Sequence, residues 1–284
     1  MLITSPFVRQ LKTVQHQNIS YYDNQKTGKE TLLLLHGLAG DSSFWRYNIP
    51  FWDNQNFRVI AVDMHGINHQ TAPKKPSIEY LARTLHAFMQ SLNVAQYHIV
   101  GHSMGGQIAV CMSYWYPDKV KSMHLLAPAG FEYFSKQDID YLEPKLTPEF
   151  AFTAFTNRMM SITYHFHQWK AEWEWFHQLH QQYFNEIESY PKQIASLMKN
   201  MLHEPIYDIL PYINVPTQVF AGEKDNLIPN FFIHQHSVKQ VMTTGTKKMK
   251  NATLTLFEKT GHNLMIENSD TINRKIAYFI KYEL

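Results

Sequence analysis

Short runs of consecutive apolar residues alternate along the chain with longer stretches in which apolar residues recur every three or four positions. The short runs predict buried strands, because a strand that is covered on both faces has no need of polar positions. Six such strands are expected, at residues 31–35, 57–62, 97–100, 120–127, 217–221 and 253–257. Residues 11–23 indicate a leading antiparallel hairpin. Together these segments predict an α/β fold with a mostly parallel central sheet and helices on both faces.

The stretches between the strands have the pattern of amphipathic helices. The clearest one covers residues 78–92, where seven apolar residues share one face: Ile78, Leu81, Ala82, Leu85, Phe88, Met89 and Leu92. Ser77 precedes this helix, and its side chain is placed to cap the first turn. A similar stripe near the end of the chain predicts the last helix: Ile272, Ile276, Phe279 and Ile280.

The interval from residue 131 to residue 205 interrupts this alternation, because it is compatible with helix and has no convincing strand. It holds 16 of the 40 aromatic residues of the chain. Within it, Thr147-Pro148-Glu149 has the form of a capped helix start with proline in the first turn. We therefore predict a core of residues 1–130 and 206–284 and an inserted helical cap of residues 131–205. An aromatic cap over a core is expected to line an apolar pocket.

Residues 99–106 contain the most informative motif, an apolar strand end followed by the pentapeptide Gly-His-Ser-Met-Gly. Residues 107–112, which are apolar except for Gln107, follow and predict a buried helix. A serine on a tight turn between a strand and a helix presents its hydroxyl at the edge of the sheet. Because a serine hydroxyl is a poor nucleophile by itself, this setting indicates that a neighbouring group activates Ser103.

Three further motifs follow predicted strands: His36-Gly37-Leu38-Ala39-Gly40, Gly222-Glu223-Lys224-Asp225 and Gly261-His262-Asn263. With the serine pentapeptide, their order along the chain resembles that of the α/β-hydrolase superfamily, in particular its capped serine esterase and lipase branch. The resemblance covers roughly residues 31–130 and 206–284 and does not extend to the cap. It implies the α/β-hydrolase fold.

The resemblance also implies that Ser103, His262 and Asp225 act as a catalytic triad. Ser103 would attack an acyl carbonyl, His262 would take its proton and later deliver it to the leaving group, and Asp225 would hold the imidazole tautomer. The tetrahedral oxyanion is expected to accept hydrogen bonds from the backbone N–H groups of Leu38 and Met104. No cofactor and no metal is expected.

Two other acids are candidates for the third position of the triad, Glu223 and Asp208. The spacing after the predicted strand favours Asp225, which stands three residues after a glycine in the motif G-x-x-D.

The 16 histidines of the chain offer alternatives to His262. His102 lies inside the serine pentapeptide and is expected to point away from the serine hydroxyl, while His36 is expected to stabilise its own turn. His177 and His180 are three residues apart in the cap, a spacing compatible with metal ligands on one helix face. A polar helix face is the favoured interpretation of that pair.

One segment departs from the pattern of the family. Where the family often has D-x-x-G-x-G-x-S, this chain has Asn68 in place of the second glycine and Gln70 in place of the serine. Asparagine tolerates a left-handed backbone better than most residues, so the turn is expected to survive. The departure leaves the predicted triad intact and argues against assignment to a close subfamily.

The serine nucleophile favours acyl chemistry over that of relatives which use an aspartate. We first expect a hydrolase that cleaves carboxylic esters of small to medium apolar acyl substrates, such as a monoacylglycerol-like ester. An alternative is hydrolysis of a carbon–carbon bond in a dienoic keto acid, of the meta-cleavage-product type, with Arg158 or Lys170 anchoring a carboxylate. Another is a non-catalytic, small-molecule-binding member of the fold. Methionines in the cap support an apolar pocket: Met159, Met160, Met198 and Met201.

Composition narrows the expected partners and location. The net charge is +2, and the 26 basic and 24 acidic residues form no Lys/Arg block, which disfavours nucleic acid as a partner. The single cysteine, Cys111, excludes an intrachain disulfide and is expected to pack inside a helix. No signal peptide and no run of about 18 apolar residues is visible. We therefore expect a cytoplasmic protein without stable membrane insertion, of unknown oligomeric state.

Overall fold

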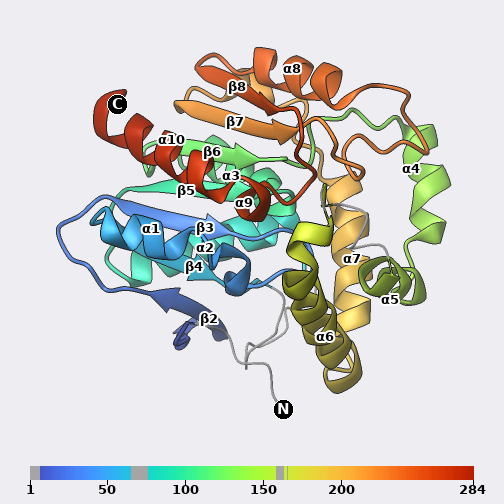
Figure 1. Ribbon diagram of the computed structural model, residues 1–284, viewed down its shortest axis with the longest axis horizontal. Coiled ribbons are helices and arrows are strands. Elements are labelled where there is room, and N and C mark those ends of the chain that lie inside the picture. Colours follow the sequence, from blue (N-terminus) through green and yellow to red (C-terminus); the bar gives the residue numbers. More distant parts are fainter. Residues whose placement is uncertain (1–6, 65–75, 158–162, 165) are drawn as a thin grey trace.

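The computed structural model describes residues 7–64, 76–157, 163–164 and 166–284. Eight strands form one sheet in the order β1-β2-β4-β3-β5-β6-β7-β8 (Figure 1). The strands are β1 (Gln10–Val14), β2 (Gln17–Asp23), β3 (Thr31–Leu35), β4 (Arg58–Val62), β5 (Tyr97–His102), β6 (Val120–Leu126), β7 (Thr217–Gly222) and β8 (Ala252–Phe257). From β3 and β4 to β8 every pairing is parallel, whereas β1 pairs with β2 and β2 with β4 in antiparallel fashion. The predicted mostly parallel sheet and leading hairpin are thus confirmed.

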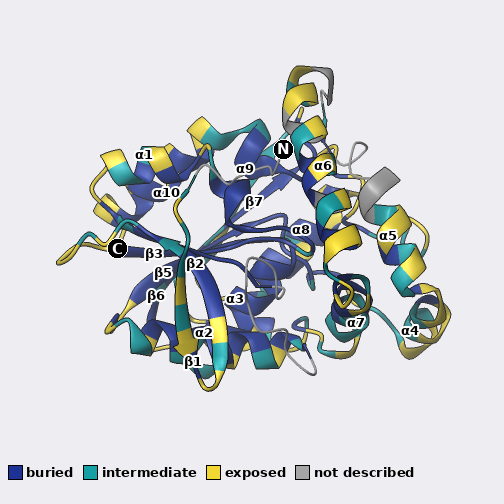
Figure 2. Cartoon of the chain, turned by 90° about the horizontal axis from the view of Figure 1, so that it is seen from below, coloured by how far each residue is buried: buried dark blue, intermediate teal, exposed yellow. Residues whose placement is uncertain are grey.

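Helices cover both faces of this sheet, as the strand sequences require. The helices of the core are α1 (Ile49–Asn54), α2 (Ile78–Ser91), α3 (Met104–Trp115), α8 (Val238–Lys248), α9 (Leu264–Glu267) and α10 (Ser269–Tyr282). One buried cluster joins the sheet to α2, α3 and α8, and a second joins it to α1, α9 and α10. Burial is concentrated on the strands and on the helix faces that meet them (Figure 2).

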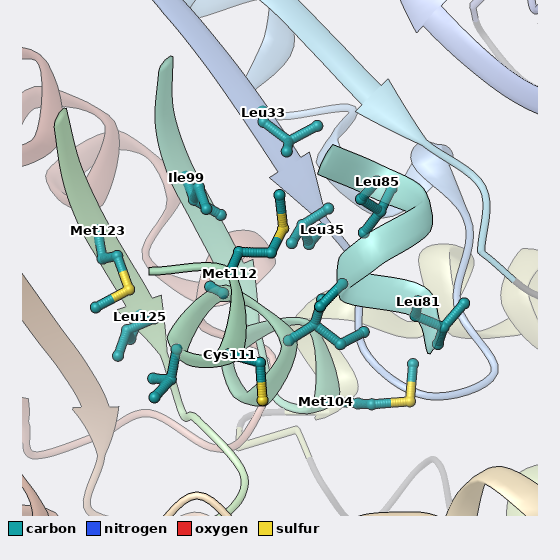
Figure 3. Close-up of a cluster of buried hydrophobic side chains, with 14 of the residues drawn as sticks. Leu33, Leu35, Leu81, Leu85, Ile99, Met104, Cys111, Met112, Met123 and Leu125 are labelled. Atoms are coloured by element: carbon teal, nitrogen blue, oxygen red, sulfur yellow. The ribbon is translucent and has the colours of Figure 1, made fainter. Parts of the chain in front are cut away.

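The strand β3 shows why the central strands are apolar along their whole length. Leu33 and Leu35 belong to the cluster under α2 and α3, while Leu32 and Leu34 belong to the cluster on the opposite face. Figure 3 shows the first cluster, in which Leu33 and Leu35 lie among side chains of the two helices. Each buried leucine contributes about 2 kcal/mol of hydrophobic stabilisation, so both faces hold the strand in place.

The helices between β6 and β7 lie together beyond the strand ends toward which the arrows of β3 and β7 point (Figure 1). Those within residues 131–205 are α4 (Lys136–Leu142), α5 (Pro148–Asn157), α6 (Lys170–Glu186) and α7 (Tyr190–His203), with the 3₁₀ turns η2 (Glu143–Lys145) and η4 (Phe166–Trp169); the 3₁₀ turn η5 (Leu210–Tyr212) follows them before β7. No strand occurs in the described residues of this interval. A third buried cluster joins α5, α6 and α7 to Ala39 of the core. That residues 131–205 form a separate cap domain stays a prediction.

Local signals in the sequence agree with the observed helix starts. The Ser77 hydroxyl accepts a hydrogen bond from the Tyr80 N–H at 3.0 Å, which caps α2. The Thr147 hydroxyl accepts from the Phe150 N–H at 3.1 Å, which caps α5. Within the described parts of the chain, no helix combines the length and apolar character needed to cross a membrane.

Candidate active site

The turn between β5 and α3 holds Ser103 in a strained conformation. Its φ is 51° and its ψ is −116°, values that residues other than glycine rarely adopt. A Cβ on Gly101 would lie 2.6 Å from the Gly105 carbonyl oxygen, and a Cβ on Gly105 would lie 2.2 Å from the Leu35 carbonyl oxygen. Both flanking positions therefore require glycine. Strain of this kind costs about 1–3 kcal/mol and is concentrated at functional sites.

Two potential backbone donors lie next to Ser103. Met104 is the first residue of α3, and the N–H groups of a first helical turn have no partner within the helix. On the other side, a Cβ on Gly37 would lie 3.2 Å from the Ser103 Cβ. Residues 36–41, named here the His-Gly loop, thus run directly past the serine. Leu38 follows Gly37 in this loop, so both residues predicted for the oxyanion hole lie in segments adjacent to Ser103.

His262 and Asp225 form a buried pair. The Nδ1 atom of His262 lies 2.7 Å from Oδ2 of Asp225, and each residue is 1% exposed. The other carboxylate oxygen, Oδ1, accepts hydrogen bonds from the N–H groups of Leu227 at 2.8 Å and Ile228 at 3.0 Å. The carboxylate is therefore held from both sides. Because Nδ1 donates to it, the Nε2 atom of the neutral His262 ring carries the basic lone pair.

Strand ends explain why these residues meet. Asp225 follows β7 and His262 follows β8, and these two strands are parallel neighbours in the sheet. Ser103 follows β5 at the same edge, where carboxyl ends of parallel strands gather. The ring of His102 brings the segments together, since its Nε2–H donates to the His262 carbonyl oxygen at 3.0 Å. Burial and the neighbouring imidazole lower the pKa of His102 well below its usual value, so this ring is neutral.

His36 has the structural place expected for it. Its Nε2 atom accepts the Met64 N–H at 3.0 Å, and its Nδ1 atom lies 2.7 Å from the Gly37 carbonyl oxygen, to which it donates. Burial lowers the pKa of the His36 ring. A neutral imidazole with one donor and one acceptor fits both contacts.

The alternative residues lie apart from this pair or outside the described part of the chain. Glu223 and Asp208 are exposed, and Lys170 is exposed beside Glu174, with 3.7 Å between charged atoms. The structure thus brings Asp225, and neither other acid, to His262. Six predicted candidates lie outside what the structure describes, either whole residues or a side chain: Asn68, Gln70, Arg158, Met159, Met160 and the His180 side chain.

Sequence reasoning missed Glu267, which supports the loop that carries His262. Its Oε2 atom accepts the N–H groups of Gly261 at 3.0 Å and Tyr164 at 2.9 Å. Burial raises the pKa of this carboxyl to about 7. The neighbouring Asn263 donates from its amide to the Thr163 hydroxyl at 3.1 Å. No motif marks these contacts, and only the position of Glu267 shortly after the His262 motif gives a signal.

A mostly parallel sheet covered on both faces, with a strained serine turn at its carboxyl edge, defines the α/β-hydrolase fold. The profile of the family described as "alpha/beta hydrolase fold" matches residues 30–269. This chain therefore belongs to that hydrolase family.

Similarity to individual relatives extends over nearly the whole chain. The chain is 28% identical over 298 residues to 2-hydroxy-6-oxononadienedioate/2-hydroxy-6-oxononatrienedioate hydrolase 1 of Pseudomonas putida, covering 98% of this chain and 97% of the relative. It is 23% identical over 286 residues to monoacylglycerol lipase ABHD6 of Homo sapiens, covering 95% and 82%. A solved structure of a probable hydrolytic enzyme from Pseudomonas aeruginosa PAO1 matches with a TM-score of 0.78 and 24% identity, covering 95% and 93%.

Proposed function

We propose that this hydrolase cleaves carboxylic esters with small to medium apolar acyl groups, using Ser103, His262 and Asp225 as its triad. The observation that carries the proposal is the buried pair of Asp225 and His262, which are 2.7 Å apart at the sheet edge where the strained Ser103 turn also lies. Such a pair holds a basic Nε2 atom in one orientation, as activation of a serine requires.

The proposed reaction has two halves. The Ser103 Oγ attacks the acyl carbon while its proton passes to Nε2 of His262, and the carbonyl oxygen becomes an oxyanion. The N–H groups of Leu38 and Met104 donate to that oxyanion, and loss of one such donor typically costs about 3–4 kcal/mol in the transition state. His262 then protonates the departing alcohol, which leaves an acyl group on Ser103. A water molecule, deprotonated by His262, releases the acid by the same route.

Apolar packing beside the His-Gly loop supports an apolar substrate. Leu38 and Ala39 pack in one cluster with Leu179 of α6 and Ile194 of α7. Ser103 itself is 6% exposed, so a substrate that reaches it leaves water. A covered, apolar surrounding favours an apolar acyl group and strengthens electrostatic stabilisation of the oxyanion.

Carbon–carbon bond hydrolysis is the second candidate, and the specific observation in its favour is the 28% identity to the Pseudomonas putida relative, whose name describes a dienedioate hydrolase. Such a substrate carries carboxylates, which call for a cation near the serine. Lys170 is exposed and lies beside Glu174, so it gives this candidate no support. The name of the Homo sapiens relative, a monoacylglycerol lipase, favours the ester.

A fluorophosphonate probe and a series of p-nitrophenyl esters from C2 to C8 test the proposal. We expect covalent labelling of Ser103, because these probes trap an activated serine. Each methylene that is buried contributes about 0.8 kcal/mol, so kcat/KM should rise roughly three- to fourfold per carbon until the pocket is full. Absence of labelling in the folded protein would favour a non-catalytic binding protein. Labelling with a flat ester profile, together with cleavage of a dienoic keto acid, would favour the carbon–carbon hydrolase.

A further inference from the structure

The two ends of the His-Gly loop are fixed from the core. The Arg9 guanidinium lies 2.9 Å from Oδ2 of Asp41, and its Nε atom lies 2.9 Å from Oδ2 of Asp63. At the other end of the loop, His36 accepts the Met64 N–H at 3.0 Å. Asp63 and Met64 follow β4 directly, so these contacts tie both ends of the loop to the edge of the sheet.

Two tyrosines from the helices between β6 and β7 hold the same loop from the opposite side. The Tyr190 hydroxyl on α7 donates to the Ala39 carbonyl oxygen at 3.3 Å. The Tyr183 hydroxyl on α6 donates to Oδ2 of Asp41 at 3.0 Å. Both side chains are buried, with ring centroids 5.6 Å apart. Burial raises the pKa of both hydroxyls, so they remain protonated donors at neutral pH.

The loop needs such support because of its backbone shape. The Gly40 N–H donates to the Gly37 carbonyl oxygen at 3.0 Å, which makes residues 37–40 a tight turn. Ala39, the third residue of this turn, has a φ of +59°, a left-handed value that favours glycine. The direction of the Leu38 N–H depends on the shape of the turn. Contacts from outside the turn therefore help to keep an unfavoured conformation in place.

We propose that Tyr183 and Tyr190 are positioning residues that hold the His-Gly loop in the shape which directs the Leu38 N–H toward the oxyanion. This inference rests on the function proposed above and extends it to residues outside the triad. In this proposal, α6 and α7 do more than cover the substrate, because Tyr183 and Tyr190 also support the loop that carries the Leu38 N–H.

The test compares Tyr183→Phe, Tyr190→Phe and the double variant with Tyr141→Phe, whose ring is exposed on α4. Phenylalanine keeps the aromatic packing and removes only the hydroxyl donor. With p-nitrophenyl butyrate, we expect kcat to fall about tenfold in each single variant and about a hundredfold in the double variant, with KM changed less than about twofold. The control should match the unaltered protein. If the double variant does not fold, the single variants still decide the matter.

Inhibition by a boronic acid distinguishes loss of oxyanion binding from a general structural effect of the substitutions. n-Butylboronic acid forms a tetrahedral anion on an activated serine, and one oxygen of that anion mimics the oxyanion. Its inhibition constant should rise by the same factor by which kcat/KM falls. A loss confined to KM, or a fall in kcat with unchanged boronate inhibition, would overturn the inference.

Failure of the proposed function has a different signature. In that case the unaltered protein would show no ester turnover that depends on Ser103 and no labelling by the fluorophosphonate. Turnover and labelling in the unaltered protein, combined with full activity of both phenylalanine variants, would leave the ester hydrolase standing and remove the positioning role of the tyrosines.

Discussion

The sheet carries a carboxylate, an imidazole and a serine hydroxyl close together at each of its two edges. At the carboxyl edge, Asp225 contacts His262 near Ser103. At the amino edge, the Glu30 carboxylate lies 3.0 Å from Nε2 of His98, and Nδ1 of His98 lies 2.7 Å from the Ser122 hydroxyl. In residue types the two sets are alike, but the burial and the backbone of their members differ.

At the carboxyl edge the acid is more buried than the serine, whereas at the amino edge the serine is more buried than the acid. The Asp225 side chain is 0% exposed, and Ser103 at the other end of its set is 6% exposed. By contrast, the Glu30 side chain is 47% exposed and pairs with Lys121 at 2.6 Å, while Ser122 is 0% exposed. A nucleophile must stand where a substrate can reach it. At the amino edge the acid faces water and the serine faces the core.

The two serines also differ in backbone conformation and in hydrogen bonding. Ser122 lies inside the strand β6, and its hydroxyl is also 2.9 Å from Nε2 of His124. Its hydroxyl is therefore held between two imidazoles. Ser103 lies on a left-handed turn immediately before α3, with a φ of 51°. Backbone shape and access therefore distinguish the proposed nucleophile, Ser103, from Ser122, which also has a carboxylate and an imidazole nearby.

Replacement of each serine by alanine gives the largest expected difference. Ser103→Ala should lower kcat by about 10⁶-fold and abolish fluorophosphonate labelling, as for a residue that forms the covalent intermediate. Ser122→Ala should keep kcat within about twofold and lower the free energy of unfolding by about 1–3 kcal/mol, because it leaves two buried ring nitrogens without their partner. Ester turnover and chemical unfolding of both variants provide the check. An inactive but well-folded Ser122→Ala variant would contradict the expectation that only Ser103 is needed for turnover.

The acids give the next largest difference. Asp225→Asn should lower kcat about 10⁴-fold, because an amide no longer fixes the His262 tautomer. Glu30→Gln should leave kcat nearly unchanged, since the imidazole of His98 is buried at the edge of the sheet opposite Ser103. Asp208→Ala, at an exposed acid, serves as the matched control. A large loss of activity in Asp208→Ala, with none in Asp225→Asn, would show that the wrong acid has been assigned to the triad.

How well the sequence predicts each edge of the sheet depends on whether its structure follows from local sequence patterns. The strands, the helix starts at Ser77 and Thr147, and the Ser103 turn follow from local patterns, because apolar periodicity and capping act over a few residues. Asp225 and His262 could be expected at one edge because each follows a strand. Their distance of 2.7 Å could not be predicted, since it depends on how β7 and β8 pair.

The amino-edge set left no such signal. His98 and Ser122 meet because β5 and β6 pair with these two residues opposite each other, just after a shift in register, and neither residue belongs to a recognisable motif. The same holds for Tyr183 and Asp41, which are 142 positions apart in the chain. Contacts of this kind arise from packing of distant elements, which one sequence does not reveal.

The smallest expected effect is a pH dependence of the free energy of unfolding, which arises at the amino edge. Burial, followed by the neighbouring His98, lowers the pKa of His124 to about 3. The unfolded chain binds a proton at this histidine near pH 6.5, while the folded chain stays neutral, so acid favours unfolding. Between about pH 6.5 and pH 3, this one group should lower the free energy of unfolding by about 1.4 kcal/mol per pH unit.

His124→Gln removes the titrating ring and isolates its contribution, because the other ionisable groups titrate in both proteins. We expect the difference in unfolding free energy between the unaltered protein and His124→Gln to fall by about 2 kcal/mol from pH 8 to pH 5. Urea unfolding at several pH values measures this difference, and ester turnover at pH 8 should be similar in both proteins. A difference that stays constant with pH would mean that folding leaves the pKa of His124 unchanged. Burial at the amino edge would then not keep the His124 ring neutral, and the contrast between the two edges would lie in access alone.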